Sequence, residues 1–229
     1  IVYPGPLSQF TAVLEGMEDS ALSAAERQLL RAHAACTALR YGIKTGQALE
    51  EESYFCAALA SALARVLATA KPDGGFTPYP GADRIRFTAS LLLLLEDLEA
   101  LGQSSTSIRL KAKNFLKTHL RADGSFRRTD LHVEPEREDF FRTALVCCAL
   151  GESTPALTKA WLRRELARQS DPTVWAACLA GAIEAGCARP EDRNKAVSVL
   201  SGFTGDLSSE EAAFTAYALA RAGAPPEVA

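Results

Sequence analysis

The chain has 229 residues and a formal net charge of −3, so it is long enough for one large core or two small ones and carries no polybasic surface for nucleic acid. Its 48% hydrophobic and 23% charged residues are typical of a globular chain and exclude disorder and collagen-like repetition. Ala and Leu far outnumber Val and Ile, which favours helices over strands. We therefore predict an all-α protein with a single domain over residues 1–229.

No apolar run approaches the roughly 20 residues that cross a bilayer, and the leucine run Leu91–Leu95 is far shorter. The first residues lack a basic segment followed by an apolar stretch, so we expect no signal peptide and a cytoplasmic location. Most of the cysteines lie in Ala- and Leu-rich helical stretches, which favours reduced thiols in the core.

The helical segments follow one another in pairs that are separated by Gly or Pro. The expected pairs are 6–17 with 23–42, 46–70 with 83–102, 105–121 with 136–151, 154–169 with 173–186, and 190–203 with 208–223. Capping residues are expected at several helix starts, and glycines are expected to end five helices. The capping segments are Ser20–Ser23, Ser153–Pro155, Asp171–Pro172, Arg189–Asp192 and Ser208–Glu211, and the terminating glycines are Gly42, Gly102, Gly151, Gly186 and Gly223.

An internal repeat relates the second helices of these pairs, each of which carries a Thr-Ala pair or a variant of it. The copies are Thr37-Ala38-Leu39, Phe87-Thr88-Ala89, Arg142-Thr143-Ala144, Trp175-Ala176-Ala177 and Phe214-Thr215-Ala216. Two Asp-Gly turns, at 73–76 and 123–126, begin the longest loops and join the first helix of a pair to the second. Long loops at corresponding ends of repeats are expected to form a rim.

The second of these turns is preceded by a basic residue, Lys111, and by the aromatic-aliphatic pair Phe115-Leu116. With the Asp-Gly-small-aromatic turn and the Thr-Ala pair that follow, it resembles the QW-type repeat of the squalene/hopene cyclase and protein prenyltransferase superfamily. The likeness covers 105–151 and, less fully, 55–102. Leu120 and Phe126 stand where the family has Gln and Trp, so the repeat is degenerate. The resemblance implies an α/α toroid whose second helices line a central cavity; an open array of about five helical hairpins is the alternative.

The chemical signatures of this superfamily are absent from the chain. Class II terpene cyclases protonate an alkene with Asp-x-Asp-Asp before Thr-Ala, whereas here the four residues before Thr143 are Asp139-Phe140-Phe141-Arg142. The run Glu136-x-Glu138-Asp139 has the acid spacing but is displaced by three residues. No recognisable Asp, Cys and His set completes the zinc site of a prenyltransferase. We therefore expect neither a metal nor a cofactor.

The candidate site lies at the starts of two inner helices beside the long loops. Arg86 and Arg142 occupy similar repeat positions and are candidates to hold a diphosphate or carboxylate, with Glu138 or Asp139 as the proton-handling group. The alternative is that these charges form Arg–acid bridges between hairpins and that the aromatic residues are core. The remaining candidate ligand-binding residues are Asp83, Arg84, Phe87, Phe141 and Trp175.

The first hypothesis for function is a toroid that binds or converts an isoprenoid-like apolar small molecule, with or without an anionic group, in its central cavity. If the protein is an enzyme, it would be a lyase, isomerase or transferase of this type. One alternative is a non-catalytic helical-repeat scaffold for a protein partner. Another is a partial domain of a larger cyclase. A nucleic-acid partner and a membrane span are not expected.

Overall fold

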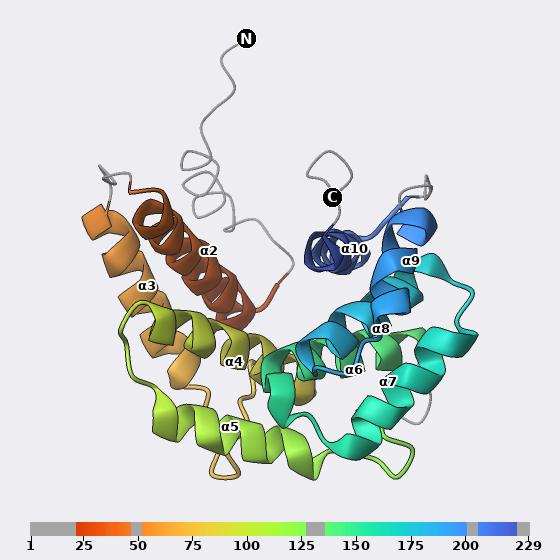
Figure 1. Ribbon diagram of the computed structural model, residues 1–229. Coiled ribbons are helices and arrows are strands. Elements are labelled where there is room, and N and C mark those ends of the chain that lie inside the picture. Colours follow the sequence, from red (N-terminus) through yellow and green to blue (C-terminus); the bar gives the residue numbers. More distant parts are fainter. Residues whose placement is uncertain (1–21, 47–51, 127–135, 201–205, 224–229) are drawn as a thin grey trace. The chain divides into compact units, whose positions relative to one another are not determined.

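The computed structural model describes residues 22–46, 52–126, 136–200 and 206–223. Within these residues the chain forms nine α-helices, one 3-10 helix and no strand beyond two isolated bridges, which confirms the all-α prediction (Figure 1). The elements are α2 (Ala24–Thr45), α3 (Glu52–Leu67), α4 (Arg84–Ala100), α5 (Thr106–Thr118), α6 (Glu136–Leu150), η2 (Gly151–Ser153), α7 (Ala156–Arg168), α8 (Pro172–Glu184), α9 (Pro190–Leu200) and α10 (Ser209–Ala222).

The chain divides into two compact units, Ile1–Phe115 and Leu116–Ala229, with the boundary inside α5. Each unit is described by itself, so the single-domain and toroid arrangements stay predictions. None of the helices in the described ranges combines the length and the apolar character that a membrane span needs. The predicted helix 6–17 lies outside the described residues.

Local sequence signals determine several of the helix starts. Ser23 and Ser208 each form a capping box, in which the serine hydroxyl accepts from a backbone N–H three residues later and a glutamate accepts from the serine N–H. Asp171 caps α8, and Pro172 occupies its first position. The predicted starts of α2, α8 and α10 are therefore confirmed to within a residue.

Several predicted helix boundaries are wrong. Helix α3 ends at Leu67 rather than at residue 70, and α5 ends at Thr118 rather than at residue 121. Gly42 is buried inside α2, which continues to Thr45 and ends at Gly46 with a φ of 65°. Gly42 continues the buried face of α2 from Leu39, so tertiary packing outweighs its weak helix propensity.

The start of α7 has no side-chain cap, because Pro155 is the N-cap residue and its side chain has no hydrogen-bond acceptor. The Thr154 hydroxyl instead donates to the carbonyl of Gly151, 2.7 Å away.

The core of unit 1 forms where α2 packs against α3 and α4. The buried positions of α3 recur at helical spacing, which gives the helix one apolar face. In α4 the Leu-rich run that begins at Leu91 is almost entirely buried. The buried residues of α3 are Phe55, Leu59, Ala62 and Val66.

Unit 2 is built around α8, in which every residue from Thr173 to Ile183 is buried. Helices α6, α7, α9 and α10 all pack against it. At Gly181 a Cβ atom would lie 3.1 Å from the Cα of Ala144, so the glycine allows close approach of α6. The Trp175 indole N–H donates to the carbonyl of Leu166 at 3.1 Å, which satisfies a carbonyl near the end of α7.

The two Asp-Gly turns are built alike. In the first, the N–H of Phe76 donates to the hydroxyl of Thr88 at 3.0 Å. In the second, the N–H of Phe126 donates to the hydroxyl of Thr143, also at 3.0 Å. In both turns the aspartate carboxylate accepts from the N–H two residues later. The threonine of the Thr-Ala pair therefore fastens the turn to α4 in unit 1 and to α6 in unit 2.

His33 gives unit 1 a dependence on pH. Its Nε2 lies 3.0 Å from the Ser90 carbonyl oxygen, which can only accept, so this nitrogen carries the proton. Burial lowers the pKa of His33 below its usual 6.5, against the opposing effects of this hydrogen bond and of the Asp97 charge. The folded state therefore favours neutral imidazole, and its contribution to stability is present above pH 6.5 and is lost as the pH falls below that value.

We expect the free energy of unfolding in urea to fall between about pH 7.5 and pH 5. His33→Gln keeps an N–H donor for Ser90 but cannot titrate, so it should reduce this fall. His119→Gln removes a different imidazole and is the matched control. Identical pH profiles for the wild type and His33→Gln would contradict this role of His33.

Candidate functional site

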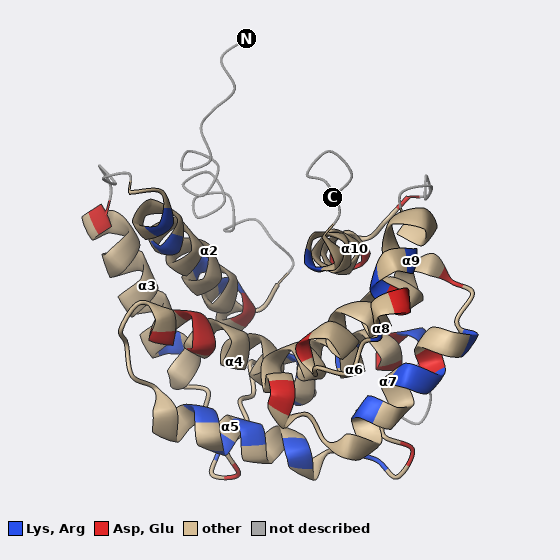
Figure 2. Ribbon diagram, viewed as in Figure 1, with Lys and Arg blue, Asp and Glu red and all other residues tan. Residues whose placement is uncertain are grey.

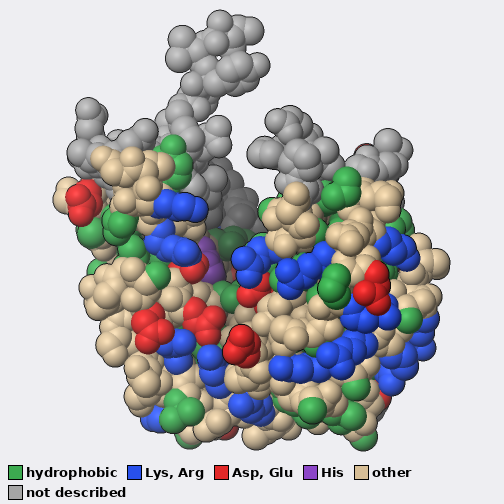
Figure 3. Space-filling view, in the orientation of Figure 1, with side chains coloured by type: hydrophobic (Ala, Val, Ile, Leu, Met, Phe, Trp, Pro, Cys, Tyr) green, Lys and Arg blue, Asp and Glu red, His purple; other side chains and the backbone are tan. Residues whose placement is uncertain are grey.

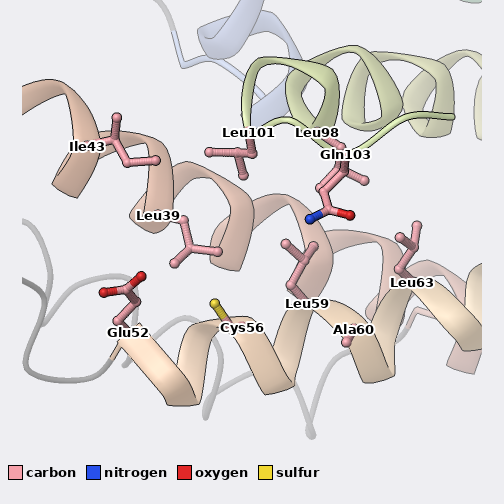
Figure 4. Close-up of a pocket in the computed structure, with 10 residues that line it drawn as sticks. All are labelled: Leu39, Ile43, Glu52, Cys56, Leu59, Ala60, Leu63, Leu98, Leu101 and Gln103. Carbon is pink, nitrogen blue, oxygen red and sulfur yellow. The ribbon is translucent and has the colours of Figure 1, made fainter.

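A hollow of about 370 Å³ opens in unit 1 between α2, α3 and the end of α4 (Figure 4). We call it the apolar hollow, because its lining is apolar apart from the carboxylate of Glu52 and the amide of Gln103. Its volume lies within the range of roughly 300–1,000 Å³ that is typical of small-molecule sites. The lining residues are Leu39, Ile43, Glu52, Cys56, Leu59, Ala60, Leu63, Leu98, Leu101 and Gln103.

Small side chains on α3 leave this space open. Leu59 belongs to the buried face of α3, whereas Cys56 and Ala60 are exposed on the adjacent face. Figure 4 shows the Cys56 thiol pointing into the space between Leu39 and Leu59. A larger side chain at Ala60 would extend into the same space.

A second hollow of about 480 Å³ adjoins the first and shares Ile43 and Leu101 with it. We call it the cationic hollow, because Arg40 and Lys44 lie in its wall, together with Thr37 and Tyr41. Arg40 pairs with Asp97, and no carboxylate of the described residues pairs with Lys44. The two hollows together can take an apolar chain and an anionic group attached to it.

The predicted site residues of unit 1 hold the start of α4. Asp83 is its N-cap and accepts from the N–H of Arg86 at 3.0 Å. The Arg84 Nη2 lies 2.7 and 2.9 Å from the two carboxylate oxygens of Asp73, in the Asp-Gly turn. The Arg84 guanidinium also lies 4.8 Å from the ring centre of Phe115. Arg84 thus joins the turn to α4 and α5.

The predicted site residues of unit 2 are mostly buried in its core. Asp139 and Arg142 are 3% and 1% exposed, and the Arg142 Nη1 lies 3.1 Å from the Asp139 Oδ1. Phe141 packs on Phe214 with ring centres 5.7 Å apart. Trp175 packs in the same core, and the Lys195 ammonium lies 5.5 Å from its ring centre. Glu138 is half-buried, and Phe87 of unit 1 is buried as well.

The structure brings together Asp83 with Arg86 at the start of α4, and Asp139 with Arg142 within α6. The two pairs lie in different units, so a shared cavity mouth stays a prediction, as do the catalytic roles of Glu138 and Asp139. Thr88 and Thr143 accept equivalent hydrogen bonds, so the two copies of the repeat can be aligned on them. In this alignment Arg142 corresponds to Phe87, and Phe141 corresponds to Arg86. Arg86 and Arg142 are therefore one position apart in the repeat.

Sequence reasoning missed Arg137, which joins the starts of three helices in unit 2. Its guanidinium lies 2.6 Å from an Asp171 carboxylate oxygen and 2.6 Å from the Thr173 hydroxyl, and it also pairs with Glu211. Hydrogen bonds from Ser208 and from Arg137 lower the pKa of Glu211. The capping acids Asp171 and Glu211 were visible in the sequence, but their shared cation on α6 depends on tertiary packing.

All six cysteines are free thiols. Burial raises the pKa of Cys148 to about 12 and that of Cys147 well above its usual value, so both thiols stay protonated. Across the described ranges, no group of three or more His, Cys, Asp or Glu residues is arranged to hold a metal ion.

Comparison with known protein families and with curated proteins finds no match to this chain. The chemistry of the hollows in unit 1 is therefore the basis of the functional proposal.

Proposed function

We propose that the protein binds an isoprenoid-like apolar small molecule with an anionic head, the chain lying in the apolar hollow and the head in the cationic hollow. The observation that carries this proposal is the adjacency of the two hollows, which share Ile43 and Leu101. The resemblance of the repeat to the cyclase and prenyltransferase superfamily supports an isoprenoid-like chain. The proposal concerns binding, and conversion of the ligand is a separate question for Glu138 and Asp139.

The charges around the hollows favour one orientation of the ligand. Each methylene moved from water into the apolar hollow contributes about 0.8 kcal/mol. Glu52 lines the apolar hollow and would repel an anionic head there. Lys44 and Arg40 line the cationic hollow and attract the head, since charge-assisted hydrogen bonds to phosphate or carboxylate are stronger than neutral ones.

Farnesyl diphosphate is the first probe, because it has a branched apolar chain and an anionic head. At a concentration about 100 times Kd it should raise the Tm by about 5 to 10 °C, because a ligand that binds only the folded state stabilises it. Ala60→Phe should abolish this rise by filling the apolar hollow. Ala57→Phe is the matched control on an exposed position of α3 outside the lining, and should retain the rise.

The head group is tested with farnesol, which has the same chain and no charge. Lys44→Gln should weaken binding of farnesyl diphosphate and leave binding of farnesol unchanged. Lys71→Gln, at an exposed lysine outside both hollows, should change neither. A rise in Tm that survives Ala60→Phe would mean that the ligand binds elsewhere, and the proposal would be wrong.

A further inference from the structure

Three arginines of α7 are each held through the Nε atom of the guanidinium. The Arg163 Nε donates to the Cys187 carbonyl at 3.2 Å. The Arg164 Nε donates to one carboxylate oxygen of Glu165 at 3.1 Å, and the Arg168 Nε pairs with the other. This anchoring fixes the guanidinium groups while leaving their terminal amino groups unused.

The acid that anchors two of these arginines is hidden from solvent. The side chain of Glu165 is 0% exposed, whereas those of Arg164 and Arg168 are 54% and 55% exposed. In the described part of the chain the terminal nitrogens of the three arginines have no partner. The surface that α7 presents is therefore positive. Lys and Arg positions recur along the α7 ribbon in Figure 2, and Lys and Arg side chains gather on the corresponding part of the surface in Figure 3.

The arginines flank a strip of small side chains. At 100° per residue, Arg163 lies on one edge of the exposed face of α7, and Arg164 and Arg168 lie on the other. Ala160 and Ala167 are exposed between these edges. We call this surface the α7 arginine face. Its alanines let another backbone approach closely, and its arginines can bind groups on either side of that backbone.

We propose that the α7 arginine face docks an acidic amphipathic helix of a partner protein. The arginines lie on both edges of the face, so a helix with acidic residues on both sides of an apolar seam can pair with all of them. A single small anion would contact the arginines of only one edge. The face offers alanines and a single exposed leucine, Leu157, rather than a cluster of large apolar side chains for insertion into a bilayer. It has no exposed aromatic ring on which nucleic-acid bases could stack.

The geometry sets the length and charge pattern of the partner. The 13 residues of α7 span about 20 Å at 1.5 Å per residue, so a partner helix of about 14 residues covers the face. Its carboxylates would accept from the terminal amino groups of the arginines, as in charge-assisted pairs. The interaction should weaken as salt increases, because these pairs lie at the exposed rim.

The probe is a fluorescent peptide of about 14 residues made of two Leu-Ala-Ala-Ala-Glu-Ala-Glu repeats, which place glutamates on both edges of a seam of Leu and Ala, and the measurement is fluorescence anisotropy. The test variant combines Arg163→Gln, Arg164→Gln and Arg168→Gln with Glu165→Gln, which avoids leaving a buried charge unpaired. Lys111→Gln with Lys117→Gln removes the same net charge from exposed lysines of α5 and is the control. Thermal unfolding verifies that both variants are folded.

The wild type and the control should bind the peptide with Kd values within about twofold of each other, and the test variant should bind at least about tenfold more weakly. Equal binding by the test variant would overturn the proposal. Equal binding of a scrambled peptide without an apolar seam would also overturn it. Binding to phosphatidylserine vesicles in place of the peptide would show that the surface recognises anionic lipid.

Discussion

Replacing Arg142 with methionine is expected to lower the free energy of unfolding by about 3 to 5 kcal/mol. Arg142 is 1% exposed, and its guanidinium pairs with the equally buried Asp139. Methionine has a similar length but no charge, so the Asp139 carboxylate stays in the core without this guanidinium. The cost arises mainly from the loss of this buried ion pair rather than from lost packing.

A double-mutant cycle separates the pair from its surroundings. Asp139→Leu should destabilise the protein as much as Arg142→Met, whereas the double variant should lose less than either, because both charges are then absent. Urea unfolding at neutral pH measures each free energy. A stable Arg142→Met variant that no longer binds farnesyl diphosphate would contradict the structural role and support the predicted anion-binding role of Arg142.

Gly124→Ala is expected to cost about 2 to 4 kcal/mol. Gly124 has a φ of 96°, where an L-residue is strained by about 1 to 2 kcal/mol. A Cβ atom there would also lie 2.6 Å from the carbonyl oxygen of Leu157 and 2.9 Å from the Cβ of Trp161. The substitution must therefore move the Asp-Gly turn away from α7.

Gly102→Ala is the matched control for the backbone strain. Gly102 has a φ of 79°, and nothing lies within 4 Å of the position that a Cβ would occupy. It should lose only the strain energy, about 1 kcal/mol. The difference between the two variants measures the contact between the turn and α7. Equal losses in urea unfolding would mean that this contact does not constrain the turn.

The sequence was sufficient to predict most helices because their signals are local. Ser23, Asp171 and Ser208 cap helices through residues two or three positions away. The prediction that Gly42 ends a helix was wrong because Gly42 is buried in α2, and this burial results from the packing of α3 and α4 against α2. The Thr-Ala repeat was recognised, but the hydrogen bond from Phe76 to Thr88 spans 12 residues and has no local signature.

The candidate site was less predictable for the same physical reason. Arg84 and Arg142 both precede a Thr-Ala pair, yet one binds Asp73 in a turn and the other is buried with Asp139. The sequence shows the charge of each arginine but not its burial, which depends on helices far along the chain. The apolar hollow was missed because leucines at helical spacing, such as Leu59 and Leu63, are the pattern of an ordinary core.

The contact made by the turn glycines has a consequence for how such hairpins can diverge. A Cβ at Gly74 would lie 2.7 Å from the carbonyl oxygen of Lys111, just as one at Gly124 would approach that of Leu157. Each turn glycine thus contacts the main chain of the following helix, and every residue type has this main chain. The residue at the contact is an exposed lysine, Lys111, in one unit and an exposed leucine, Leu157, in the other. A hairpin joined in this way can be duplicated while the outer surface of its neighbour changes freely.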